Sequence, residues 1–197
     1  MKVLIIGLIY GNRSSDYILQ NIAHCGHQDI KVRYVNTEGI SNALNDGIDL
    51  MKELNMDAVA FLANDIIEPQ DWLKKKVESL QTYPDAGIVA SSLDCGRNQI
   101  NSELIISNWL MSKDTIDKVG YFQESMFPYG PIDLDYCHRC HAAGLKTYYV
   151  MDCLAQHIGD HATGNEHGWD KGALVEKGYG LMYQGGDYFL NRKDGTT

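Results

Sequence analysis

The chain has 197 residues, of which 44% are hydrophobic, 10% aromatic and 22% charged, a composition typical of one globular domain with a sizeable core. Its formal net charge of -9 disfavours non-specific binding to nucleic acid or to an anionic membrane as the main role, because an acidic surface repels phosphate. No segment has the roughly 20 consecutive apolar residues of a membrane-spanning helix.

The first apolar run and the cysteines indicate a cytoplasmic protein. Residues 2–10, KVLIIGLIY, carry one basic residue and no small-residue cleavage site, which favours a buried first strand over a signal sequence. The five cysteines, at positions 25, 95, 137, 140 and 153, are odd in number and unevenly spread. We therefore expect reduced thiols rather than a disulfide framework.

Short apolar runs then alternate with helix-like segments. The pattern predicts a helix from Ser14 or Ser15 to about His24, strands at 30–36 and 57–63, and a helix at 41–55 between them. Within the strand at 57–63, residues 58–63 are continuously apolar, as in a strand buried on both faces.

The second half of the chain continues this alternation. We expect helices at 70–83, 113–120 and 133–144, the last ending at Gly144, and strands at 86–93, 102–112 and 145–152. Residues 158–197 are rich in glycine and aspartate and predict a loop-rich closing segment. The prediction is a single α/β domain over residues 1–197, with helices flanking a mostly parallel sheet.

In such a sheet, ligands bind beyond the carboxyl ends of the strands. Polar residues follow four of the expected strands: Tyr10 to Arg13, Asn36 to Gly39, Asn64 with Asp65, and His157. Asp65 is a candidate oxygen ligand for Mg²⁺ or Mn²⁺, and His157 a candidate second ligand. An Asx turn at Asn64 and a solvated loop histidine are the alternatives that these residues leave open.

Two further segments are candidate functional positions. Asp133 and Asp135 begin a predicted helix, where the helix dipole alone favours acidic residues, but where a carboxylate can also act as a general base. Gly39 to Gly47 form a glycine turn leading into a helix, which can present backbone N–H groups and Asn45 to a phosphate or a sugar. The segment matches neither a Walker loop nor a dinucleotide-binding fingerprint.

Residues 137–141 match the C-x-x-C-H pattern of covalent haem attachment. At helical spacing, however, Tyr136, Cys137, Cys140 and Ala143 share one stripe, which predicts that both cysteines are small core residues. A zinc site would need a second ligand pair at comparable spacing, and the sequence contains none.

In order, these pieces resemble family 2 glycosyltransferases of the GT-A type. Residues 38–91 contain a G-x-x-x-A-x-N-x-G turn and helix, a strand ending in a D-x-D-like motif, then P-x-x-W-L and P-x-x-G-I-V. Residues 120–150 resemble the later segment of that family, in which a glycine-aromatic turn precedes an acidic helix start, an A-G pair and a strand that leads to a histidine.

The resemblance implies a role for each matching position. Asp65 and His157 are expected to hold Mn²⁺ or Mg²⁺ at the diphosphate of a nucleotide-sugar donor, and Asp133 is expected to be the catalytic base. Donor contacts are implied for Tyr10, Asn12, Arg13, Glu38, Gly39, Asn45 and Asn64, and acceptor-side contacts for Trp109, Tyr129 and Asp135.

The resemblance thus implies an inverting, metal-dependent sugar transfer to an acceptor hydroxyl. Ala63 and Ile132 stand where the family has acidic residues beside Asp65 and Asp133. The alternative is a GT-A protein that binds nucleotide sugars, or acts as a nucleotidyltransferase, without transfer. A saccharide, a lipid-linked glycan, a protein or a modified nucleobase could be the acceptor, and Arg192 or Lys193 could meet phosphate from a closing lid.

Overall fold

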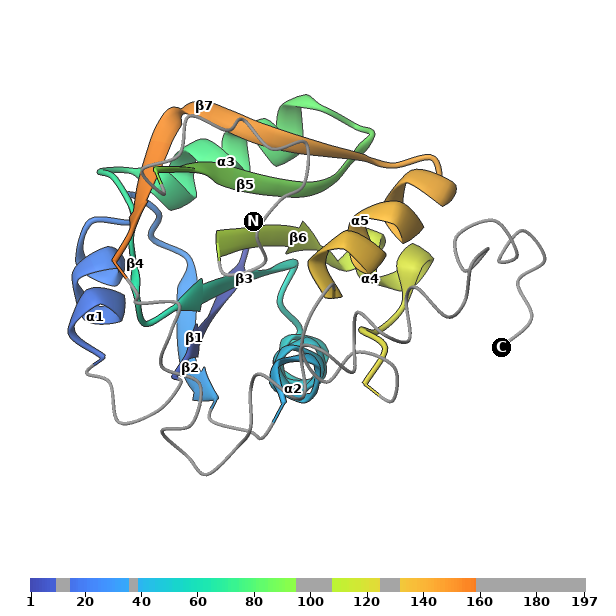
Figure 1. Cartoon of the computed structure of the whole chain (residues 1–197), viewed down its shortest axis with the longest axis horizontal. Coiled ribbons are helices and arrows are strands. Elements are labelled where there is room, and N and C mark those ends of the chain that lie inside the picture. The colour runs from blue at the N-terminus through green and yellow to red at the C-terminus, as the bar shows by residue number, and fades with distance from the viewer. Residues whose placement is uncertain (10–14, 36–38, 95–107, 125–131, 159–197) are drawn as a thin grey trace.

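The computed structural model of the chain describes residues 1–9, 15–35, 39–94, 108–124 and 132–158 (Figure 1). Within these ranges, the strands are β1 (Val3–Leu8), β2 (Ile30–Val35), β3 (Ala58–Ala63), β4 (Ile66–Ile67), β5 (Ala86–Asp94), β6 (Trp109–Ser112) and β7 (Lys146–His157). The helices are α1 (Asp16–Ala23), α2 (Ile40–Glu53), α3 (Trp72–Thr82), α4 (Lys113–Val119) and α5 (Ile132–Ala142).

The strands form one mixed sheet in the order β2-β1-β3-β6-β5-β7-β4. β1 pairs in parallel with β2 and β3, and β5 pairs in parallel with β7, whereas β6 lies antiparallel between β3 and β5. β4 follows β3 after only two residues, yet it pairs antiparallel with β7 at the end of the strand order. The sheet is therefore curled, and Figure 1 shows β7 arching over to β4 beside α1.

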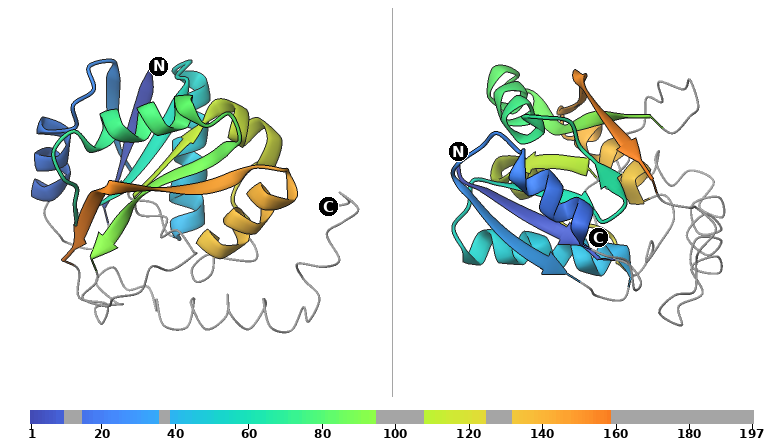
Figure 2. Two further views of the ribbon diagram at one scale, coloured as in Figure 1. Left: turned by 90° about the horizontal axis from the view of Figure 1, so that it is seen from above. Right: turned by 90° about the vertical axis from the view of Figure 1, so that its left-hand side faces the viewer.

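Helices lie on both faces of the sheet (Figure 2), and an apolar cluster packs between the sheet and the helices on each face. Along β3, Val59 and Phe61 belong to the cluster that packs against α2, α4 and α5. Ala58, Ala60 and Leu62 belong to the cluster that packs against α1 and α3. Because both faces are covered, the strand carries apolar residues at every position rather than at alternate ones.

Glycine lets α2 lie close to the sheet. A Cβ atom on Gly47 would come within 2.9 Å of Phe61 Cε1 and 3.0 Å of Ile6 Cγ1. Glycine inside a helix costs about 1 kcal/mol relative to alanine, but a side chain here would push α2 away from β1 and β3. Gly39, just before the helix, has a φ of 81°, which L-residues with a side chain rarely adopt.

The predicted α/β class and the order of its elements are confirmed. Among the described residues, three of the six strand pairings are parallel, and β4 was not predicted because two residues show no periodicity. β7 extends to His157, beyond its predicted end at residue 152. The closing segment predicted from residue 158 onward lies, from residue 159, outside the described residues. No helix in the described part of the chain is both long and apolar enough to cross a membrane.

Candidate active site

The carboxyl ends of three parallel strands meet at one edge of the sheet. Leu8, the last residue of β1, is in register with Val35 of β2 and Ala63 of β3. Two backbone hydrogen bonds continue these pairings beyond the strands, from Ile9 N to Val35 O at 3.1 Å and from Asn64 N to Leu8 O at 3.2 Å. The chain therefore leaves all three strands at the same edge, where ligands bind in open α/β sheets.

Asp65 lies beside the end of β7 at this edge. Its carbonyl oxygen accepts a hydrogen bond from Ile158 N at 2.8 Å, and Ile66 of β4 is in register with His157. The Asp65 side chain is partly exposed, whereas Asn64 is buried. The fold thus brings together the backbones of the two residues expected to bind a metal, although 92 positions separate them in the sequence (157 − 65).

A carboxylate and an imidazole are donors that Mn²⁺ accepts, and the carboxylate also suits Mg²⁺. In the part of the chain that the structure describes, no group of three or more His, Cys, Asp or Glu residues could hold a metal. The donor types of Asp65 and His157 thus suit such an ion, and their binding of a metal stays a prediction.

Asp133 lies in the first turn of α5, and its Oδ1 accepts a hydrogen bond from Leu134 N at 2.9 Å. The side chain is partly exposed. The helix dipole by itself favours an acidic residue at this position, and the role of Asp133 as a general base stays a prediction.

Asp135 has a different environment from Asp133, two residues earlier. It is buried and pairs with Arg139 one helical turn later, at 2.9 Å from both Nε and Nη2. Arg139 in turn donates through Nη1 to the carbonyl oxygens of Val119 and Tyr121, at 3.0 and 3.1 Å. Asp135 therefore braces α5 against the segment after α4, and an acceptor contact by this residue stays a prediction.

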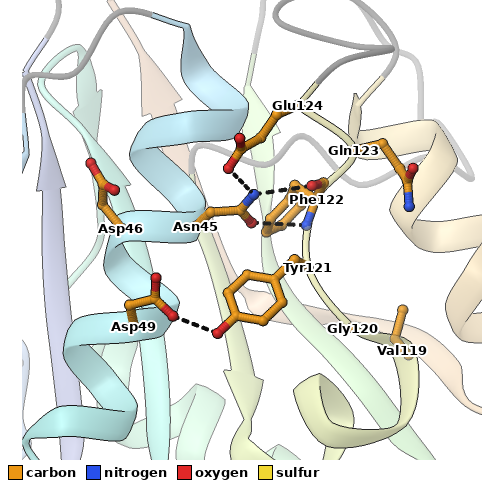
Figure 3. Close-up of a pocket in the computed structure, with 9 residues that line it drawn as sticks. All are labelled: Asn45, Asp46, Asp49, Val119, Gly120, Tyr121, Phe122, Gln123 and Glu124. Atoms are coloured by element: carbon orange, nitrogen blue, oxygen red, sulfur yellow. Dashed lines mark hydrogen bonds between the residues drawn. The ribbon is translucent and has the colours of Figure 1, made fainter.

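Residues 119–124 form a strap between α2 and α5 (Figure 3). On the α2 side, the buried Asn45 donates to Phe122 O at 3.0 Å and to Glu124 Oε1 at 2.6 Å, and accepts from Phe122 N at 2.9 Å. Tyr121 OH donates to Asp49 on the same helix. On the α5 side, Tyr136 OH donates to Gly120 O at 2.9 Å.

These contacts assign Asn45 a role that sequence reasoning missed. Both hydrogens of its amide group are engaged by the strap, so a phosphate would have to displace Glu124 or Phe122 to reach them. Donor contact by Asn45 stays a prediction, whereas its connection of the helix after Gly39 to the strap is observed.

The acceptor-side position Trp109 is fully buried, with its ring 6.2 Å from that of Phe122 and 5.9 Å from that of Tyr136, centroid to centroid. Contact between this ring and an acceptor would require the core to open, so that role also stays a prediction. Five predicted site residues lie outside the described residues, and their roles stay predictions: Tyr10, Asn12, Arg13, Glu38 and Tyr129.

The C-x-x-C-H cysteines are core residues, as the helical stripe predicted. Cys137 and Cys140 are 4% and 0% exposed and pack in the cluster between α5 and the sheet. Burial raises the pKa of the Cys140 thiol to about 12, so it stays protonated near neutral pH. Metal binding needs a thiolate and haem attachment needs an accessible thiol, so this pair serves packing.

A buried polar network behind β4 was also missed. Its members come from α1, the turn after β4, α3, β5, the residue before β6, and β7, and they are Asn21, Glu68, Lys76, Ser91, Asn108 and Cys153. The one signal in the sequence is Lys76, which shares the apolar face of α3 with Trp72, Leu73 and Leu80.

Comparison with known proteins is consistent with this architecture. Residues 8–146 match the family Glycosyl transferase family 2. A197 from STIV aligns with 14% identity and a TM-score of 0.55, over 81% of this chain and 87% of that one.

Two enzyme structures are also similar. One is the mannosyltransferase PcManGT from Pyrobaculum calidifontis in complex with GDP-Man and Mn²⁺ (10% identity, TM-score 0.59, 92% of this chain and 64% of that chain). The other is GalNAc-T7 with UDP, GalNAc and Mn²⁺ (9% identity, TM-score 0.58, 89% of this chain and 48% of that chain). No curated protein sequence matches. At these identities the structural similarity shows the fold alone, whereas the family match covers well over half of the chain, which therefore belongs to Glycosyl transferase family 2.

Proposed function

We propose that the chain transfers a sugar from a nucleotide-diphosphate sugar to an acceptor hydroxyl, with a divalent metal and with inversion at the anomeric carbon. Membership of the family supports sugar transfer in general. The finer proposal depends on one observation, the pairing of Asp65 and Ile66 with His157 and Ile158 where the parallel strands end.

Asp65 and His157 are the residues proposed to hold the metal, with Mn²⁺ the first candidate. The two enzyme structures of similar fold contain Mn²⁺ together with GDP-Man, or with UDP and GalNAc, which supports this class of donor and metal here. When bound, such an ion neutralises negative charge that develops on the leaving diphosphate.

The donor's nucleotide and phosphates are proposed to lie along the edge where β1, β2 and β3 end. Backbone N–H groups at the turn before α2 can meet phosphate, because a helix N-terminus favours an anion. The proposed donor contacts in this region come from Tyr10, Asn12, Arg13, Glu38, Gly39, Asn45 and Asn64.

Asp133 is the proposed general base. Its carboxylate accepts the proton of the acceptor hydroxyl as the oxygen forms a bond to the anomeric carbon. The bond from that carbon to the diphosphate breaks on the opposite face, so the configuration inverts. Trp109, Tyr129 and Asp135 are the proposed acceptor-side residues, and Arg192 or Lys193 are proposed to meet phosphate when the closing segment covers the donor.

The test is a panel of nucleotide-diphosphate sugars with Mn²⁺ and a mixture of glycan acceptors, scored by thermal shift and by released nucleoside diphosphate. A donor that binds should raise the melting temperature, and transfer should release diphosphate in an acceptor-dependent and EDTA-sensitive way. The anomeric configuration of the product, measured by NMR, tests inversion. Stabilisation without release for every donor would favour a nucleotide-sugar-binding protein and contradict the proposal.

A further inference from the structure

β4, the strand that directly follows Asp65, is the shortest strand in the described part of the chain. β4 has two residues, Ile66 and Ile67, and its pairing with β7 is extended by the hydrogen bond from Ile158 N to Asp65 O. A ladder this short supplies few hydrogen bonds, each contributing on the order of 1 kcal/mol. A further contact to β4 lies on the side of the strand that faces away from β7.

That contact is the side-chain amide of Asn21 on α1. Its Nδ2 donates to Ile66 O at 2.7 Å, and its Oδ1 accepts from Glu68 N at 2.9 Å. In a parallel sheet, a residue makes the same two bonds to the neighbouring strand. It bonds to the carbonyl oxygen of the residue before its partner and to the N–H of the residue after its partner. The amide group therefore takes the place of one residue of a neighbouring strand beside Ile67.

Asn21 is itself held firmly. The side chain is fully buried, and its backbone carbonyl accepts a hydrogen bond from Trp72 Nε1 at 2.9 Å. Both the donor and the acceptor of the amide are used, as expected for a buried polar group. A second contact, from His24 just after α1, supports the same segment, because His24 Nε2 lies 2.9 Å from Glu68 O.

We propose that Asn21 is a positioning residue for the proposed metal site at Asp65 and His157. Its amide group acts as a one-residue strand that holds β4, and with it Asp65, against the end of β7. The metal part of this inference depends on the proposed function, and the positional part does not. Asn21 lies on α1, away from both predicted ligands in the sequence, and its amide group bonds to backbone atoms of Ile66 and Glu68, just after Asp65.

The experiment compares the full chain with Asn21→Leu, which keeps a similar volume but removes both hydrogen bonds. Asn21→Ala is the second variant, in case the leucine is not accommodated. Ile116→Ala on α4 is the control, because Ile116 is a buried core residue on the other face of the sheet. Variants are compared after their free energies of unfolding have been measured.

The first readout is amide hydrogen exchange without metal. In the Asn21 variants, the amides of Glu68 and Ile158 should exchange at least tenfold faster than in the wild type, whereas in Ile116→Ala the two amides should change no more than its loss of global stability explains. The second readout is the Mn²⁺ dissociation constant, measured by EPR of free Mn²⁺. It should rise about tenfold, the lower end of the effect of losing a support to metal ligands.

Unchanged exchange at Ile158 in a folded Asn21 variant would overturn the inference. If the wild type binds Mn²⁺, an unchanged Mn²⁺ dissociation constant in the Asn21 variants would also overturn it. If the wild type binds no Mn²⁺ with or without donor, the metal part of the proposed function fails. The exchange rates alone then decide whether Asn21 holds β4 against β7.

Discussion

Lys76 and Glu68 form an ion pair in which neither side chain is exposed, with Lys76 Nζ 2.8 Å from Glu68 Oε1. The ammonium group also donates to Asn108 O at 2.8 Å and lies 4.7 Å from the centroid of the Trp72 ring. The other carboxylate oxygen of Glu68 accepts from Ser91 Oγ at 2.6 Å. Because Glu68 directly follows β4, the pair ties the segment after Asp65 to α3 and β5.

Removing one partner of this pair should be costly. Lys76→Met should lower the free energy of unfolding by about 3–5 kcal/mol, because the Glu68 carboxylate is then buried without a counter-charge. Adding Glu68→Gln should restore part of that loss. Urea unfolding measures both. Lys75→Met is the control, since the Lys75–Asp152 pair is exposed and such pairs contribute at most about 1 kcal/mol. Equal losses for Lys75 and Lys76 would contradict this account.

Asn45 should matter to both activity and stability. Asn45→Ala removes its three bonds to the strap, which we expect to cost about 2 kcal/mol and to reduce the rate of transfer at saturating donor about tenfold or more. The reason is that the strap connects α2 to α5, where Asp133 lies. Tyr121→Phe is the control, because it removes the hydroxyl's bonds to Asp49 and Lys52 from the same strap but leaves the Asn45 bonds in place. A normal rate in a folded Asn45→Ala would show that the strap does not position the base.

Asp133→Asn should abolish most transfer without unfolding the protein. Loss of a general base typically costs about 10²- to 10⁴-fold in rate, while donor binding measured by thermal shift should persist. Asp114→Asn is the matched control, because Asp114 occupies the first turn of α4 as Asp133 occupies that of α5. A rate within about threefold of wild type for Asp133→Asn would exclude it as the base.

Asp65→Ala should weaken Mn²⁺-dependent donor binding at least tenfold, because a carboxylate ligand is lost. Excess EDTA should have a similar effect on the wild type, with recovery on adding Mn²⁺. Asp57→Asn, just before the opposite end of β3, changes the same residue type away from the site and should leave donor binding unaltered. Donor binding that is insensitive to both EDTA and Asp65→Ala would refute the metal assignment.

The residues themselves explain what could be predicted from the sequence. β3 was predictable because all of its residues are apolar, and α2 because Ala43, Ile48 and Met51 recur at helical spacing. Asn21 was not predictable, since its partners lie 45 and 47 positions away and contribute only backbone atoms. Asn45 was recognised as part of a motif, but its partners depend on how residues 119–124 return to α2.

Stability should fall as the pH rises above about 9, because α5 buries two groups that resist ionisation. Burial raises the pKa of Cys140 from 9.0 to about 12, and burial likewise raises the pKa of Tyr136 above its ordinary value of 10.0. The unfolded chain loses these protons first, so the folded state binds more protons between pH 9 and 12, and the free energy of unfolding declines across that range.

Cys140→Ala tests the thiol's share of this decline. The variant should be less stable at pH 7, where it leaves a cavity, but its stability should fall less steeply between pH 9 and 12, as measured by urea unfolding at a series of pH values. Ile116→Ala is the control, because it also leaves a cavity but removes no ionisable group, so its slope between pH 9 and 12 should match that of the wild type. An equally steep decline without Cys140 would mean that the thiol's ionisation does not contribute to alkaline unfolding.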